Sequence, residues 1–88
     1  MKTSPDFKIV TIVDDYMAVP VGEKATHFGG KVLLNEVSAF LLANMEKNIT
    51  REELLQRLLG EYDVDPDRAA RDLDTVLLKL SQLGLIEE

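Results

Sequence analysis

The chain has 88 residues, a formal net charge of −6 and no cysteine. Its length fits a single domain over residues 1–88, and its acidity argues against nucleic acid as a partner, because the average field of the protein repels a phosphate backbone. The lack of cysteine excludes disulfides, thiolate metal sites and cysteine nucleophiles. No apolar run is long enough for a signal peptide or a membrane span, so we expect a cytoplasmic protein that does not bind membranes.

The start of the chain is rich in β-branched and aromatic residues, which favour strands. Alternation of side chains predicts a first strand over Phe7–Val13 and a second over Tyr16–Val19. Between them we expect a tight turn at Asp14-Asp15, although the favoured Asp-Gly pair is absent. Pro20 ends the second strand because it has no amide hydrogen to donate to a ladder.

A polar segment, Gly22–Gly30, follows the second predicted strand and is expected to be a loop. It ends in Gly29-Gly30, a turn signal, after which Lys31–Leu34 is predicted to be a third short strand. Residues 1–6 show no such pattern, and we expect them to be flexible.

The second half of the chain predicts helices that carry their own capping residues. Asn35 is a natural N-cap for a first helix over Glu36–Glu46, because its side chain can accept from unpaired amides of the first turn. Thr50 and Glu53 have the spacing of a capping box, which predicts a second helix over Arg51–Tyr62.

Asp65-Pro66 predicts the start of a third helix, with aspartate as the cap and proline at the first helical position. Gly84 suits the left-handed residue that ends a helix, and Leu85 and Ile86 are expected to fold back onto the core. The apolar stripe of this helix consists of Ala69, Leu73, Val76, Leu77, Leu80 and Leu83. Three short strands followed by three helices indicate an α+β domain that is winged-helix-like.

Five groups of residues, taken in order, carry a family resemblance. They are Tyr16–Pro20, Gly30–Val37 with its Leu-Asn helix start, Glu61–Asp65 with its Tyr-Asp-Val-Asp linker, the third-helix residues Asp72, Leu73, Leu77 and Leu80, and the Gly-Leu-Ile ending at Gly84–Ile86. Together they resemble the peptide-recognition proteins of the pyrroloquinoline-quinone D family, over almost the whole chain. One departure is that many members have a tryptophan in the first helix, whereas this chain has none.

This resemblance implies three antiparallel strands followed by three helices. It also implies a function, which is to bind the leader segment of a ribosomally synthesised precursor peptide and present it to a modifying enzyme, often a radical SAM enzyme. The leader adds as a further strand to the third strand and packs against the third helix. The peptide-binding residues implied here are Lys31, Val32, Leu33, Arg71, Asp72, Thr75 and Leu78.

Two of these residues also have a simpler interpretation. Asp72 can pair with Arg68 one turn back on the helix, or it can contact the peptide. Leu78 lies opposite the apolar stripe on a helical wheel, so it is either an ordinary exposed leucine or a floor for peptide side chains. The sequence does not decide which flank of the helix faces the peptide.

No set of residues points to catalysis, a cofactor or a metal. His27 is the single histidine and is expected in an exposed loop. Asp14 and Asp15 alternate across a strand and converge on nothing, while Ser38 and Ser81 have no nearby histidine. We therefore predict a protein that is not an enzyme.

Two other functions fit a small α+β or acidic domain. A winged-helix DNA-binding regulator is the alternative, but the third helix carries Asp65, Asp67, Asp72 and Asp74 against Arg68, Arg71 and Lys79. An acyl carrier would need a serine such as that of Asp-Ser-Leu, and this triplet is absent. An exposed edge strand permits either a monomer or a weak or domain-swapped homodimer.

Overall fold

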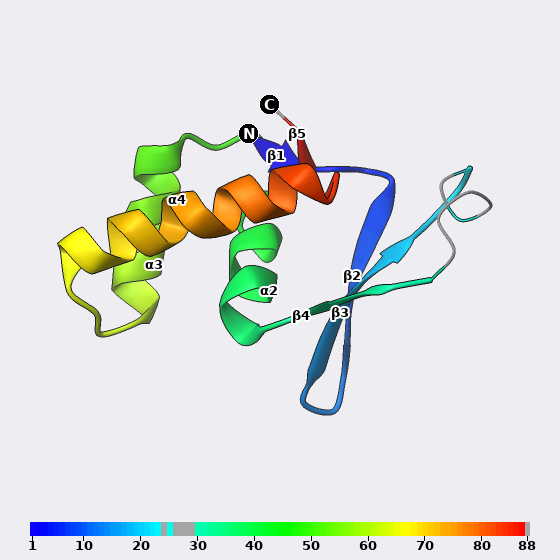
Figure 1. Cartoon of the computed structure of the whole chain (residues 1–88), viewed down its shortest axis with the longest axis horizontal. Helices are drawn as coiled ribbons and strands as arrows, with labels where there is room; N and C mark the ends of the chain where they lie inside the picture. Colours follow the sequence, from blue (N-terminus) through cyan, green and yellow to red (C-terminus); the bar gives the residue numbers. More distant parts are fainter. Residues whose placement is uncertain (24, 26–29, 88) are drawn as a thin grey trace.

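The computed structural model describes residues 1–23, 25 and 30–87 (Figure 1). The main sheet is antiparallel and has the strand order β2 (Phe7–Ile12), β3 (Asp15–Pro20) and β4 (Val32–Leu34). The helices that follow are α2 (Glu36–Ala43), α3 (Arg51–Glu61) and α4 (Pro66–Gln82). The predicted α+β class, a three-stranded antiparallel sheet followed by three helices, is confirmed.

The hairpin of β2 and β3 turns one residue earlier than predicted. Ile12 pairs with Asp15, so the turn consists of Val13-Asp14 rather than Asp14-Asp15. Val13 adopts a positive φ of 58°, an unfavourable conformation for a β-branched residue. The core sets this register, because a slip by one residue would turn Ala18, which is fully buried in the core, to the opposite face of the sheet.

Strand β4 is an edge strand in the part of the chain that the structure describes. It pairs with β3 through Tyr16–Leu34 and Ala18–Val32, and its other side has no partner strand there. Lys31 lies just before the strand, which begins one residue later than predicted. Gly30 has a φ of 140°, as suits a glycine turn, whereas Gly29 and His27 lie outside the described residues.

The predicted helix caps are confirmed. The side chain of Asn35 accepts from the amide of Ser38 at 2.8 Å, and Thr50 forms the capping box with Glu53. Asp65 caps α4 with Pro66 in the first turn, and Gly84 ends the helix with a φ of 76°.

Helix α2 ends three residues earlier than predicted. The side-chain amide of its C-cap, Asn44, donates to the carbonyl of Phe40 at 2.8 Å. The chain then turns, and the side chain of Met45 is fully buried in the core. Tertiary packing of Met45 therefore decides the end of this helix.

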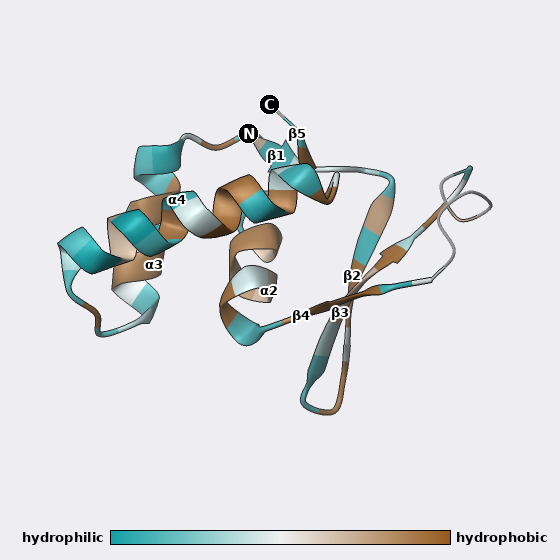
Figure 2. Cartoon of the chain, in the orientation of Figure 1, coloured by the Kyte–Doolittle hydropathy of each residue, from teal (hydrophilic) through white to brown (hydrophobic). Residues whose placement is uncertain are grey.

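The core lies where α2 meets the sheet, α3 and α4. Most residues of α2 are apolar, as its predominantly brown ribbon in Figure 2 shows. The predicted stripe of α4 is buried except at its margins, where Val76 is half-buried and Leu83 is exposed. The buried apolar residues of this core are Phe7, Ala18, Leu41, Leu42, Met45, Ile49, Leu54, Leu58, Ala69, Leu73, Leu77, Leu80 and Leu85.

A second small sheet, which the sequence analysis did not predict, joins the two ends of the chain (Figure 1). Strand β1 (Lys2–Thr3) pairs antiparallel with β5 (Ile86–Glu87). The amide of Thr3 also donates to the carbonyl of Met45 at 2.8 Å, and Ser4 donates to Leu85 at 2.9 Å. Residues 1–4, for which flexibility was expected, are thus held largely by backbone hydrogen bonds. Backbone bonds do not depend on side-chain type, so the sequence of so short a segment does not reveal them.

An ion pair joins α3 to α4. Nε of Arg51 lies 2.5 Å from Oδ1 of Asp74, and Nη2 donates to Oδ2 at 3.0 Å, so the guanidinium binds the carboxylate through two bonds. Nη2 also donates to the carbonyl of Ala70 at 3.3 Å. The hydrogen bonds from Arg51 lower the pKa of Asp74 below its ordinary value, and those same bonds raise the pKa of Arg51.

Replacing Asp74 by Asn is expected to lower the melting temperature at neutral pH and low salt. Because the folded pKa of Asp74 is lowered, its contribution is present above the ordinary aspartate pKa of about 3.9 and is lost as the pH falls through the lower folded value. Both side chains are partly exposed, so high salt should also weaken the effect. Thermal melts of wild type and Asp74→Asn across pH and salt measure it.

The control is Glu46→Gln, which removes the same charge from an exposed position. It should leave the melting temperature nearly unchanged. A difference between wild type and Asp74→Asn that stays constant down to strongly acidic pH would contradict the assignment of the bridge.

Candidate functional site

In the part of the chain that the structure describes, β4 presents an exposed apolar side chain and an outer edge without a partner strand. Val32 and Leu34 are half-buried and pack against the core, whereas Leu33, between them, is 72% exposed. Alternate residues of a strand point to opposite faces, so this pattern follows from the register of β4 on β3. The outer side of β4 is a place where another extended chain can form backbone hydrogen bonds.

A hollow of about 310 Å³ separates β4 from α4. We call it the strand groove. Its lining residues come from β4, from the start of α2 and from one face of α4, and they are Val32, Leu33, Leu34, Asn35, Ser38, Thr75, Val76, Lys79, Leu80 and Leu83. Of the residues predicted to bind peptide, the structure brings Val32, Leu33 and Thr75 together here.

The other predicted residues lie outside the strand groove. Lys31 is exposed and directly precedes β4, and Arg71 is exposed on α4. Leu78 is 61% exposed, which confirms its predicted position away from the apolar stripe of α4. The hydroxyl of Thr75 donates to the carbonyl of Arg71 at 3.2 Å, which joins successive turns of this part of the helix. Whether these side chains bind a ligand stays a prediction.

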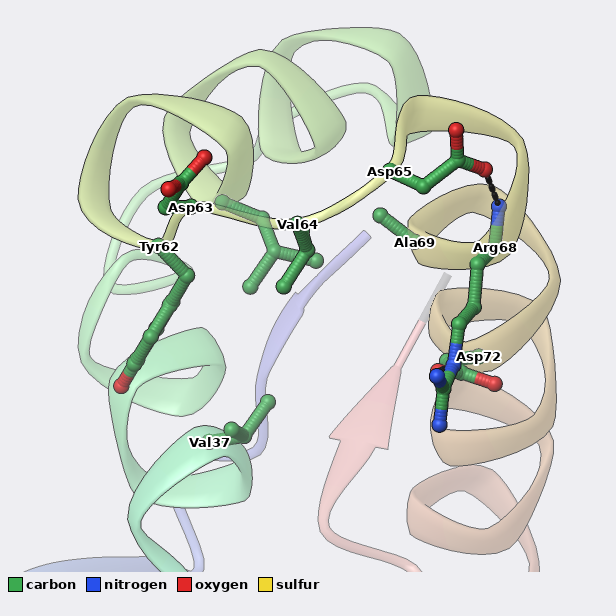
Figure 3. Close-up of a pocket in the computed structure, with 9 residues that line it drawn as sticks. Val37, Tyr62, Asp63, Val64, Asp65, Arg68, Ala69 and Asp72 are labelled. Atoms are coloured by element: carbon green, nitrogen blue, oxygen red, sulfur yellow. Dashed lines mark hydrogen bonds and ion pairs between the residues drawn. The ribbon is translucent and has the colours of Figure 1, made fainter.

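Asp72 lines a second and larger hollow, of about 490 Å³, at the corner between α2, α4 and the linker before α4 (Figure 3). We call it the corner pocket. Figure 3 shows Val37 on α2, the linker residues across the top and the α4 side chains opposite. The lining residues are Val37, Leu58, Tyr62, Asp63, Val64, Asp65, Arg68, Ala69 and Asp72.

The α4 side of the corner pocket is charged. Oδ2 of Asp65 accepts from the backbone amide of Arg68 at 3.0 Å, and Nε of Arg68 lies 3.7 Å from Oδ2 of Asp72. The predicted pairing of Asp72 with Arg68 therefore exists, and the same carboxylate also lines the pocket. Both interpretations of Asp72 remain compatible with the structure.

Tyr62 forms the opposite wall and is held in place from two sides. Its hydroxyl donates to Oε2 of Glu36 at 3.1 Å, and its ring packs edge-on against Phe40 with centroids 5.5 Å apart. Burial, followed by the hydrogen bond to Glu36, raises the pKa of Tyr62 above its ordinary value, so the hydroxyl stays protonated at neutral pH. From the sequence alone, Tyr62 is expected to end the second helix and Asp65 to cap the third, and no pocket is predicted between them.

Of the described residues considered for catalysis, only Ser38 lines one of the two hollows, the strand groove. Asp14 and Asp15 are exposed at the hairpin, and Ser81 is exposed near the end of α4. Among the residues that the structure describes, no three His, Cys, Asp or Glu side chains form a group that could hold a metal ion. In the same residues, no helix has both the length and the apolar character needed to cross a membrane.

The model of the family described as coenzyme PQQ synthesis protein D matches residues 20–86, well over half of the chain. Two solved structures share the fold. One is TbiB1 in complex with the TbiA(beta) leader peptide, with a TM-score of 0.78 and 25% identity over 99% of this chain and 95% of that one. The other is lasso peptide synthetase B1 complexed with the leader peptide, with a TM-score of 0.75 and 17% identity over 99% and 96%.

No curated protein sequence matches this chain. The family match includes β4, all three long helices and both hollows. The chain thus belongs to the coenzyme PQQ synthesis protein D family.

Proposed function

We propose that this protein is a non-catalytic accessory protein that binds the leader of a ribosomally synthesised precursor peptide and presents it to a modifying enzyme. The observation that carries the proposal is the outer edge of β4, which has no partner strand among the described residues, beside the strand groove. The two structures with the same fold are both described as complexes with leader peptides, which supports a peptide as the ligand.

Strand addition explains how such a surface selects a peptide. Backbone bonds to β4 give affinity with little demand on sequence, and the side of α4 that faces the groove supplies specificity. A disordered leader loses about 2–5 kcal/mol of the gross interaction on ordering. An affinity near micromolar, about −8 kcal/mol, is the natural outcome.

The proposed contacts follow the geometry of the groove. Lys31, Val32 and Leu33 pair with the peptide backbone, and Thr75 faces the peptide from α4. The flank of α4 beyond Thr75 carries Leu78, whose exposed side chain covers an alternate residue of the peptide. We propose Arg71 and Asp72 as polar contacts on the same helix.

The DNA-binding alternative has no support from a specific feature of the structure. Helix α4, which a winged-helix regulator would insert into a groove, exposes Asp67, Asp72 and Asp74. Asp74 is engaged by Arg51, and Arg68 lies beside Asp72, so two of the nearby guanidinium groups already have carboxylate partners. A helix with this charge is a poor reader of DNA.

The partners and setting of the protein form part of the same proposal. The modifying enzyme is proposed to be a radical SAM enzyme, as the family resemblance implies, and the protein itself to supply no catalytic group. The absence of cysteine suits the cytoplasm. The protein is proposed to be a monomer, or a weak or domain-swapped homodimer formed through the edge of β4.

The protein is expected to bind the leader of the precursor peptide encoded beside it and not to bind duplex DNA at physiological salt. Its net charge of −6 repels the phosphate backbone, whereas a neutral strand edge accepts a peptide. Isothermal titration calorimetry with the peptide and a gel shift with random duplex measure the two. Saturable DNA binding together with no heat from the peptide would rule out the proposed function.

Proline substitution at positions 31, 32 and 33 is expected to give alternating results. Amides along an edge strand alternate between the neighbouring strand and the open side. Proline at an outward amide removes a bond to the peptide and spares the sheet, whereas proline at an inward amide breaks the β3–β4 ladder. Helical circular dichroism and calorimetry separate the two outcomes, and a uniform effect along the strand would contradict strand addition.

Replacing Leu78 by Asp is expected to weaken peptide binding while changing stability by no more than about 0.5 kcal/mol, because Leu78 is exposed. Ile12→Asp is the matched control, since Ile12 is 55% exposed but lies at the far end of the hairpin (Figure 1). Thermal melts and calorimetry on both variants test this. Normal binding by a stable Leu78→Asp variant would place the peptide on another surface.

A further inference from the structure

The strand groove and the corner pocket are lined by the same two helices, α2 and α4. On α2, Val37 lines the corner pocket and its neighbour Ser38 lines the strand groove. On α4, one face lines both, with residues at helical spacings of three and four. In chain order these residues are Asp65, Arg68, Ala69 and Asp72 in the corner pocket, and Thr75, Val76, Lys79 and Leu83 in the strand groove.

The end of β4 lies next to the start of α2, which lines both hollows. Strand β4 runs from Val32 to Leu34 and continues directly into the start of α2 at Glu36. Asn35 and Ser38, at the start of α2, line the strand groove, and Val37 lines the corner pocket. The two hollows therefore follow one another along α2 and α4.

The inside of the corner pocket is apolar. Leu58 and Ala69 are buried at its base, Val37 is half-buried, and Val64 is 44% exposed and points inwards in Figure 3. The ring of Tyr62, fixed by Phe40 and Glu36, closes one side. Such a surface favours a large apolar side chain, which removes these carbons from water.

The rim of the same pocket is acidic. Its charged lining residues are three aspartates, Asp63, Asp65 and Asp72, and one arginine, Arg68. Arg68 lies beside Asp72, whereas Asp63 is exposed on the linker. An apolar base beneath a net negative rim is complementary to an apolar side chain with a cationic neighbour.

We propose that the corner pocket is a second recognition site for the leader, and that it takes a large apolar residue flanked by Lys or Arg. This inference rests on the proposed function and extends it, because the peptide is then read at two points. All strand pairs of the main sheet are antiparallel, so a peptide added antiparallel to β4 places this apolar and basic anchor on the N-terminal side of its strand segment.

Selection from a phage-displayed library of random 16-residue peptides tests the proposal on the full chain. Wild type is expected to enrich peptides with a large apolar residue next to Lys or Arg, at a fixed distance before an alternating strand segment. Val64→Asp places a charge in the apolar base and should reduce the enrichment of the apolar residue about tenfold while the strand segment persists. Asp63→Lys, on the exposed rim, should abolish the preference for basic neighbours, because the rim then carries two carboxylates and two cationic groups.

Ile12→Asp serves as the control and should select the same peptides as wild type, and thermal melts verify the folding of each variant. If Val64→Asp fails to fold, the loss of the basic preference in Asp63→Lys decides. Enriched peptides without an anchor, an anchor after the strand segment, or preferences unchanged in both variants would overturn the corner pocket and leave the proposed function standing. No enriched peptide on wild type would remove both.

Discussion

The burial of Ala18 at the centre of the main sheet is the constraint on which the rest of the structure depends. Ala18 pairs with Ile9 on one side and Val32 on the other, and it is fully buried. Any shift of β3 by one residue would move Ala18 out of the core to the opposite face, so the register of both ladders is fixed. That register turns Leu33 outwards and places Asn35 at the start of α2, and β4 has no partner strand on its far side among the residues that the structure describes.

What the sequence predicted well was local. Asn35, Thr50 and Asp65 act within three residues of themselves, so their caps and the helices that they begin are legible in the sequence. What it missed depends on distant contacts. The position of the turn at Val13-Asp14 is set by the burial of β3 in the core. Strand β1 is held by backbone hydrogen bonds to residues more than forty positions away.

Of the two hollows, the strand groove contains residues that the sequence predicted, and the corner pocket was not predicted. Val32, Leu33 and Thr75 could be placed together because the strand and helix that carry them were predicted correctly. The corner pocket could not be foreseen, because Val37, Leu58 and Val64 each look like an ordinary core or linker residue in the sequence. Only the packing of α2 and α3 against α4 turns them towards one space, and Asp72 belongs to that space as well as to its pair with Arg68.

The elements that line the two hollows are held by hydrogen bonds and an ion pair within the protein itself. The start of α2 is held by the Asn35 cap, the start of α4 by the Asp65 cap, and α3 is tied to α4 by Arg51 and Asp74. In a complex formed on such a surface, most of the ordering cost falls on the peptide. Affinity then depends on how readily the peptide is extended along β4. In the proposed complex, the contact at the corner pocket adds selectivity to the contact at β4. Both contacts lie along one face of α4, so a peptide must satisfy both at a fixed spacing.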